Sequence, residues 1–281
     1  MTISAMIQRL GRFPGSTRSV SLMRLGLPPI IWTRWGSDWL FYQHLDWPRM
    51  FLSAAFFLFS VMMFMGCWSR LSSAATGICL LVFYYWIGLH LGREPYTHHH
   101  TYILAIAPCL LAMTPCGGSY SWDRWRKVLR AERTGQPIPE EAGDLWAMRL
   151  IAVQLSMIYF WAGYAKSTVP YLSGERMEQY MMYLYFGSDY PEFPGFHAIA
   201  IFLAWSSMVL EYVLAVALLL RRWQRSLVPV ALVFHAVIYW TLPVGTFSIT
   251  MAILFLAWLD PSTVHQWIDR ISGVKNQGTT S

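Results

Sequence analysis

Charged side chains are scarce in this sequence. Asp, Glu, Lys and Arg make up 13% of its 281 residues, whereas 56% of the residues are hydrophobic. A soluble domain of average composition carries about twice that fraction of charge, so the composition excludes an ordinary soluble globular protein. The apolar runs are long and recur through most of the chain, which indicates a polytopic membrane protein.

Signals of several other protein classes are also missing. The four cysteines form no C-x-x-C pair and fall in or beside apolar segments, which is typical of small buried side chains. No basic stripe alternates with aromatic residues, so we expect no nucleic-acid partner. We see no internal repeat and no low-complexity segment. The first 19 residues are polar and basic, without an apolar run that leads to a small-residue cleavage site, so we expect no cleavable signal peptide.

Eight apolar segments are visible, and we predict an all-α bundle of about eight transmembrane helices. Their approximate bounds are 20–33, 50–67, 73–91, 101–116, 146–165, 197–220, 226–242 and 246–259. The first segment is the weakest, because Pro28 and Pro29 interrupt it and Arg24 lies inside it. The fourth and the eighth are short for a span, which needs about 20 residues.

The basic residues predict the orientation of these helices. If the spans alternate, most of the 21 Lys and Arg residues fall on the side of the N-terminus. Because cytoplasmic loops carry the excess of positive charge, we expect both termini in the cytoplasm. Lys166 then lies at the extracytoplasmic end of the fifth segment.

Three stretches on the cytoplasmic side have an amphipathic pattern. They lie near residues 3–12, 122–130 and 264–271, and each combines apolar residues at helical spacing with basic residues on another face. We predict short interfacial helices that lie on the inner leaflet. The predicted parts of the chain are a cytoplasmic amphipathic segment (1–19), a transmembrane domain (20–260) and a cytoplasmic interfacial helix with a tail (261–281).

Four ionisable residues lie within or at the ends of the apolar segments. Glu211 and His235 are central in neighbouring segments, His100 opens the fourth segment and Lys166 closes the fifth. An ionisable group at membrane depth is costly and by default suggests a functional site. Each also has a structural interpretation: Lys166 could extend to the headgroups, Glu211 could pair with a buried polar group, and His235 could be a satisfied core histidine.

The face of the helix that carries Lys166 predicts which way this residue points. Tyr159, Gly163 and Lys166 share one helical face, and Ala162 lies beside it. Small residues favour close helix packing, so we expect this face to point into the bundle. His98, His99 and His100 do not predict a metal site, because consecutive helical residues point about 100° apart.

The same residues resemble a known family. Gln154, Tyr159, Gly163 and Lys166, with Gly174 and Met177 after them, are similar to the core signature of the vitamin K-dependent γ-glutamyl carboxylases. Those enzymes belong to the wider group of horizontally transferred transmembrane (HTTM) domains. The resemblance covers about residues 20–260.

Two further elements carry the resemblance. The run from His99 to Tyr102 is similar to an Asn-His-Ser-Tyr element of the family, with His99 in place of Asn. Glu211, His235 and Phe247-Ser248 follow in the order and spacing of the family. Tyr171 stands where the family has Trp.

The resemblance implies a membrane enzyme in which Lys166 deprotonates reduced vitamin K or another quinol. The resulting anion reacts with O2, a strong alkoxide removes a γ-proton from a peptide glutamate, and CO2 adds to the carbanion. By the same resemblance His100 polarises the oxygen intermediate, and no metal is needed. The residues expected at the quinone site are Tyr159, Gly163, His99, Tyr102, Tyr171 and His235, and those expected to be structural polar groups are Glu211 and Gln154.

A second hypothesis keeps the binding site without this reaction. The chain would be a non-catalytic or differently catalytic membrane partner in the maturation of a peptide or toxin, and would bind a lipid, a quinone or a peptide. We expect a short bacterial-type member without the large lumenal domain of animal carboxylases, in a bacterial inner membrane, with its site toward the extracytoplasmic side. A partner protein would then present the peptide. A transporter is disfavoured, because no inverted repeat is visible.

The predicted topology can be tested by labelling single cysteines in intact cells. We expect cysteines at Arg124, Lys127 and Arg222 to be protected from an impermeant maleimide, because these positions are predicted to be cytoplasmic. Cysteines at Glu175 and Asp189 should react. The reverse pattern would show that the orientation is inverted.

Overall fold

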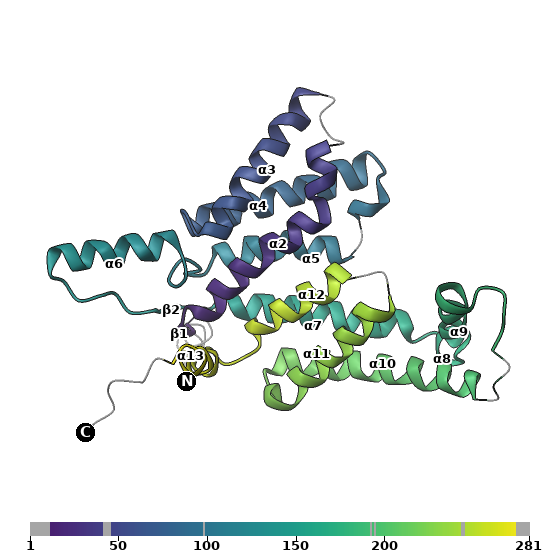
Figure 1. Ribbon diagram of the computed structural model, residues 1–281. Coiled ribbons are helices and arrows are strands. Elements are labelled where there is room, and N and C mark those ends of the chain that lie inside the picture. Colours follow the sequence, from purple (N-terminus) through teal and green to yellow (C-terminus); the bar gives the residue numbers. More distant parts are fainter. Residues whose placement is uncertain are drawn as a thin grey trace, which may run out of the picture. The chain divides into compact units, whose positions relative to one another are not determined.

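The computed structural model describes residues 12–41, 46–97, 99–191, 193, 195–242 and 245–273, and most of them are helical (Figure 1). The chain forms two compact units. Unit 1 consists of Met1–Ile151 with Thr246–Ser281, and unit 2 of Ala152–Gly245. The predicted all-α fold class is confirmed for the described residues, apart from one short sheet, and several of the helices are candidate membrane spans.

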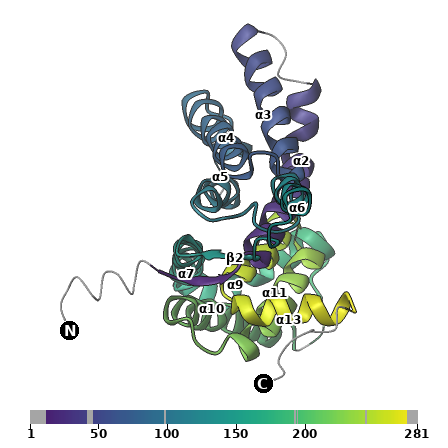
Figure 2. The same ribbon diagram turned by 90° about the vertical axis from the view of Figure 1, so that its left-hand side faces the viewer.

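Unit 1 contains the helices that precede residue 151 and those at the end of the chain. They are α2 (Arg18–Phe41), α3 (Trp47–Met65), α4 (Ser69–Val82), α5 (His99–Ala112), α6 (Trp122–Thr134), α12 (Gly245–Leu254) and α13 (Pro261–Ile271). A π-helical stretch, Phe83–His90, continues α4, and 3₁₀ turns cover Glu94–Tyr96 and Phe255–Ala257. Helix α4 packs against both α3 and α5, as Figures 1 and 2 show. Strands β1 (Pro14–Ser16) and β2 (Ala142–Asp144) pair antiparallel.

Unit 2 is built on three longer helices. Helix α7 (Ala147–Lys166) begins in unit 1 and continues through unit 2, where α10 (Phe196–Leu220) and α11 (Gln224–Thr241) follow. Between α7 and α10 the chain forms α8 (Val169–Leu172), α9 (Glu175–Met181) and a π-helical turn, Met182–Phe186.

All eight predicted apolar segments lie on helices, but eight membrane spans are not confirmed. Three helical stretches of the described residues are long and apolar enough to cross a membrane: Trp47–Met65, Ser69–His90 and Phe196–Leu220. A bent pair, Gly245–Ala257 with Pro261–Ile271, meets at 106° and would add a fourth. Helix α5 has 14 residues, which is about 21 Å at 1.5 Å per residue and less than a hydrocarbon core of about 30 Å.

The amphipathic predictions can be compared with the structure for two of the three stretches. Residues 122–130 lie on α6 and residues 264–271 on α13, so both stretches are helical. The stretch near residues 3–12 falls almost entirely outside the described residues. All four cysteines are free thiols, of which Cys79 and Cys116 are buried.

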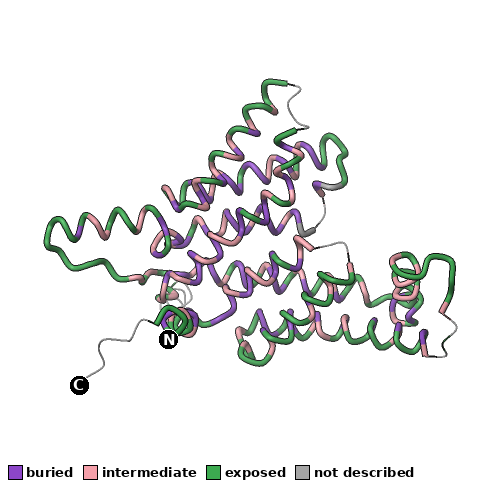
Figure 3. The backbone as a smooth tube through the Cα atoms, in the orientation of Figure 1, coloured by how far each residue is buried: buried purple, intermediate pink, exposed green. Residues whose placement is uncertain are grey.

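The first apolar segment forms a longer and more regular helix than its two prolines indicated. Pro28 and Pro29 do not end α2, which runs without interruption for 24 residues. Arg24 is fully buried in this helix, so its charge must be satisfied by the protein. Figure 3 shows how the buried residues follow α2 and α5 within unit 1.

Backbone carbonyls satisfy the Arg24 guanidinium. Its Nε donates to the carbonyl of Cys116 at 3.0 Å, and one terminal nitrogen donates to Met63 and Phe64 at 2.5 and 2.7 Å. The other terminal nitrogen donates to Tyr120 at 2.5 Å. Met63 and Phe64 lie in the last turn of α3, where the backbone carbonyls carry partial negative charge. Arg24 therefore joins α2, the end of α3 and the segment before α6.

The turn after α3 leaves no room for a larger residue. Gly66 has φ of +70°, and a Cβ at this position would lie 2.4 Å from the Cβ of Ser121 and 3.0 Å from Cζ of Arg24. Glycine adopts this left-handed conformation at little cost. The turn can thus approach the guanidinium closely.

A second arginine holds the ends of unit 1 together. Arg18 Nε lies 2.6 Å from Glu141 Oε2, and one of its terminal nitrogens lies 2.5 Å from Asp269 Oδ1. The hydrogen bond from Arg18 keeps the pKa of the Asp269 carboxyl below its ordinary value. This residue therefore connects the start of α2 with the segment before β2 and with α13.

Replacing Arg24 by lysine tests the role of its four hydrogen bonds. An ammonium group is a compact donor and cannot reach all four carbonyls from one position. We expect Arg24→Lys to destabilise the protein by about 3 kcal/mol, since each bond to a charged donor contributes about 1.5–3 kcal/mol. The measurement is the thermal unfolding midpoint of purified protein. The control is Arg133→Lys on exposed α6, and equal midpoints for both variants would contradict the role assigned to Arg24.

Candidate functional site

The polar side chains inside unit 2 gather where α7, α10 and α11 pack together. Lys166 is the last residue of α7, and its Nζ donates a hydrogen bond to Oε1 of Glu211 in α10. The Glu211 residue is only 4% exposed, whereas 26% of the Lys166 side chain is exposed. The ring of Tyr171 lies 6.0 Å from Nζ. Lys166 thus contacts a buried carboxylate; the small-residue face of its helix predicted only that Lys166 points into the bundle.

The second oxygen of Glu211 is available for another interaction. Oε2 is buried and has no hydrogen-bond partner among the described residues. A buried acceptor without a partner costs about 1–3 kcal/mol. A carboxylate can accept hydrogen bonds at both oxygens or take up a proton. The Lys166–Glu211 pair therefore has one oxygen that could receive a hydrogen bond or a proton from a bound molecule.

A second polar pair lies on the same helices. The hydroxyl of Tyr159 in α7 lies 2.5 Å from Nε2 of His235 in α11, and both residues are buried. Glu211 and His235 are both buried within unit 2. The hydrogen bonds seen for them join Glu211 to Lys166 and His235 to Tyr159.

Small and hydroxylated residues allow α7 and α10 to pack closely. A Cβ at Gly163 would lie 3.2 Å from the ring of Tyr212, so glycine makes room for this tyrosine. Ser167 Oγ lies 2.9 Å from the Tyr212 hydroxyl, and Ser156 Oγ donates to the carbonyl of Ala215 at 2.7 Å. These contacts hold the helix face that carries Tyr159 and Lys166 against α10.

The sequence interpretation missed some polar residues of this region. Ser207 Oγ lies 3.0 Å from the hydroxyl of Tyr171, and Ser207 is four residues before Glu211. Residues four apart lie on one helical face, so the spacing of Ser207 and Glu211 could have indicated this contact. No sequence pattern could have indicated Tyr212, because its ring contacts α7 only where Gly163 has no side chain.

The remaining predicted site residues lie elsewhere or are only partly described. His99 and His100 begin α5 in unit 1, and their side chains lie outside the described part of the structure. Tyr102 follows on the same helix, half-buried, with its ring 5.4 Å from that of Tyr84. Gln154 is half-buried on α7. His100 belongs to unit 1 and Lys166 to unit 2, and their joint role in one reaction stays a prediction.

Comparison with known proteins identifies one family. The model of the HTTM domain matches residues 33–262, a range that includes both polar pairs of unit 2 and the start of α5. No curated protein and no solved structure matches at a significant level.

Single and double substitutions can test the Lys166–Glu211 pair. Lys166→Met leaves Glu211 buried without its cation, so we expect a loss of about 2 kcal/mol, below the 3–5 kcal/mol of a fully buried pair because Lys166 is partly exposed. Lys166→Met combined with Glu211→Gln removes both charges and should cost less than Lys166→Met alone. Thermal unfolding midpoints provide the comparison, with Arg176→Met as the exposed control. If the double variant costs as much as Lys166→Met and Glu211→Gln measured separately and added together, the two residues do not interact.

Proposed function

The chain belongs to the HTTM domain family, and from this premise we propose that it is a membrane enzyme of the vitamin K-dependent carboxylase type. The observation that carries the proposal is the Lys166–Glu211 pair: an amine at a helix end that donates to a buried carboxylate, whose second oxygen has no hydrogen-bond partner among the described residues. Such a pair can take a proton from a bound molecule.

The residues of unit 2 fit a hydroquinone as the bound molecule. A hydroquinone has hydroxyl groups that donate hydrogen bonds, and Glu211 Oε2 is a buried acceptor without a partner among the described residues. The Tyr171 ring beside Lys166 offers an aromatic face. When bound, a reduced quinone would supply an acidic hydroxyl and the electrons for the reduction of O2. Lys166, Glu211 and Tyr171 would hold it.

The ion pair changes how proton transfer is assigned. The resemblance assigns the base to Lys166, and a lysine must be neutral to accept a proton. The carboxylate of Glu211 instead favours the charged lysine. Either Oε2 accepts the substrate proton directly, or the proton of Nζ first moves to Oε1 and the neutral amine accepts. Both routes end with a protonated Glu211 beside charged Lys166, so we propose that the pair acts as one base.

The other parts of the proposal follow from the resemblance. We propose that reduced vitamin K or another quinol, O2 and CO2 are the co-substrates, and that a peptide glutamate is the acceptor. His100 would polarise the oxygen species, with His99 and Tyr102 beside it in sequence. Tyr159 and His235 would fix the polar end of the site through their hydrogen bond.

A peptide-binding role without this chemistry is the second candidate. The segment between α7 and α10 exposes several tyrosines, and Tyr183 is 85% exposed. Tyrosine provides a large contact area together with a hydroxyl, and it is common at binding surfaces. This exposure supports a partner in peptide or toxin maturation as well as an enzyme that modifies a peptide.

Quinol-dependent O2 consumption by purified protein tests the enzymatic proposal. We expect Lys166→Arg and Glu211→Gln each to lower the rate about 100-fold or more, which is the usual contribution of a general base. Arginine does not release its proton near neutral pH, and glutamine cannot accept one. Lys127→Arg is the matched control, since it makes the same change on exposed α6.

Two results would overturn parts of this proposal. Full activity of Lys166→Arg would show that Lys166 does not accept the substrate proton, and Glu211 alone would then be the base. If the wild-type protein consumes no O2 with any quinol, the carboxylase-type reaction is wrong and the peptide-binding role is favoured.

A further inference from the structure

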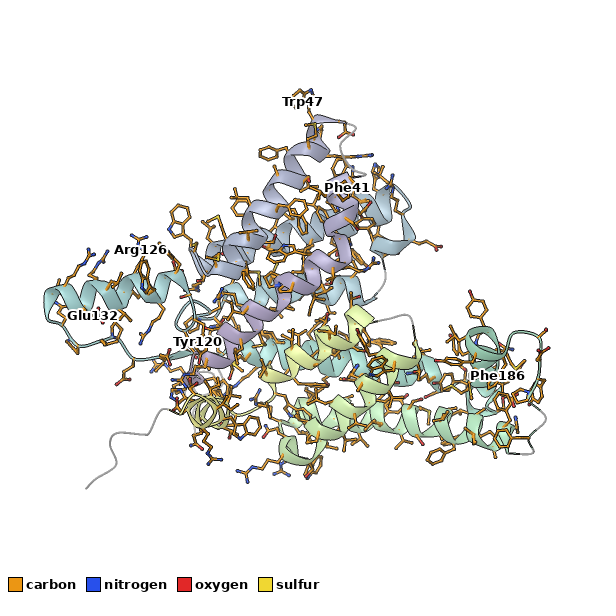
Figure 4. The ribbon with its side chains drawn as sticks, viewed as in Figure 1. Phe41, Trp47, Tyr120, Arg126, Glu132 and Phe186 are labelled. Carbon is orange, nitrogen blue, oxygen red and sulfur yellow. The ribbon has the colours of Figure 1, made fainter. Side chains whose placement is uncertain are left out.

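Helix α6 is an arm of unit 1 with few contacts to the rest of the chain. Ala131 is its one buried residue, and Figure 1 shows the helix extending away from α3, α4 and α5. The segment 135–141 returns along it to β2, and Arg124 donates to the carbonyl of Pro139 in this segment. Figure 4 shows the side chains of Arg126 and Glu132 on the arm and Tyr120 at its base.

The start of the arm is fixed to the turn between two candidate membrane spans. The carboxylate of Asp123 accepts hydrogen bonds from the backbone N–H groups of Trp68 and Ser69 at 3.0 and 2.7 Å, and so caps α4. The N–H of Asp123 donates to the carbonyl of Gly66 at 3.1 Å. If α3 and α4 cross the membrane, as their length and composition allow, the turn between them lies at a membrane surface and α6 begins there.

One side of the arm is used by the protein itself. Asp123 caps α4, Arg124 contacts Pro139, and Ala131 is buried. At about 100° per residue, Arg124 and Ala131 lie on the same side of the helix. The opposite side is left uncovered.

The uncovered side combines an apolar and a basic stripe. Trp122, Trp125 and Leu129 follow i, i+3, i+7 spacing, and the two tryptophans are 44% and 49% exposed with their rings 4.5 Å apart. Directly beside this stripe, a second one follows i, i+4, i+7 spacing and consists of Arg126, Arg130 and Arg133. None of these three arginines has an ion-pair partner among the described residues. The arm thus presents aromatic rings and unpaired cations together.

We propose that α6 binds the anionic headgroups of the lipid leaflet at whose surface it begins. Tryptophan favours the boundary between headgroups and acyl chains, and basic residues next to it attract anionic lipid by about 1 kcal/mol each. The orientation predicted from the basic residues makes this the cytoplasmic leaflet. The arm would then hold unit 1 at a fixed depth and make the protein sensitive to lipid charge, independently of the reaction in unit 2.

Hydrogen exchange of the full-length protein in lipid nanodiscs tests this proposal. Exchange of residues 122–134 is followed by mass spectrometry while the fraction of phosphatidylglycerol in phosphatidylcholine is raised. We expect phosphatidylglycerol to slow exchange in the arm, and high salt to reverse the effect. For Arg126→Gln with Arg130→Gln, we expect an apparent affinity for phosphatidylglycerol about 30-fold lower, which corresponds to two basic residues.

The matched control removes two cations elsewhere. Arg222→Gln with Arg225→Gln changes the net charge by the same amount at the start of α11 and should leave the protection of the arm intact. Equal loss in both double variants would mean that only net charge matters, and would overturn the proposal. So would exchange that is the same in both lipids, or protection that occurs only in native membranes with their other proteins. The last result would assign the arm to a partner protein.

Discussion

A charged side chain inside an apolar bundle must find its hydrogen-bond or ion-pair partners within the protein, because lipid acyl chains have no polar groups. Two residues of this chain show how that constraint organises the structure. Arg24 is fully buried and is satisfied by four backbone carbonyls, so α2, the end of α3 and the segment before α6 meet around it. Glu211 is satisfied by Lys166, which fixes the end of α7 against α10. In each unit, a buried charged group thus helps to position helices against one another.

The two solutions have different chemical consequences. The carbonyls around Arg24 cannot change their charge at physiological pH, and each of the three guanidinium nitrogens donates to a backbone carbonyl. The Lys166–Glu211 pair consists of two titratable groups, and one carboxylate oxygen has no partner among the described residues. A group that is only structural gains from full satisfaction, whereas a site for chemistry needs an unsatisfied position that a substrate can occupy. This contrast favours unit 2 over the surroundings of Arg24 as the place of a reaction.

The local pattern of the sequence predicted much of the helical structure and of the site face. Each of the eight predicted apolar segments lies on a helix, and the spacing of Tyr159, Gly163 and Lys166 predicted a face that points into the bundle. What the pattern could not give were partners distant in sequence: Lys166 and Glu211 are 45 residues apart, and Tyr159 and His235 are 76 apart. Arg24 was taken as a sign of weakness in its segment, because periodicity does not show that carbonyls of other helices surround it. The predicted number of about eight spans is not confirmed, since a helical pattern alone does not establish that a helix crosses the membrane.

The pairing of Lys166 with Glu211 also bears on why a lysine, and not an arginine, would be retained at this helix end. For a structural ion pair, arginine would serve well, because its planar group binds a carboxylate through two hydrogen bonds. A guanidinium bound in that way would engage both oxygens of Glu211 and would never release its proton. Lys166 donates to Oε1, while Oε2 has no hydrogen-bond partner among the described residues. A lysine can also pass its proton to a carboxylate when the surroundings are apolar. With lysine at this position, the pair keeps both an acceptor, Glu211 Oε2, and a transferable proton on Lys166 Nζ. A base that acts on a bound hydroxyl group requires both.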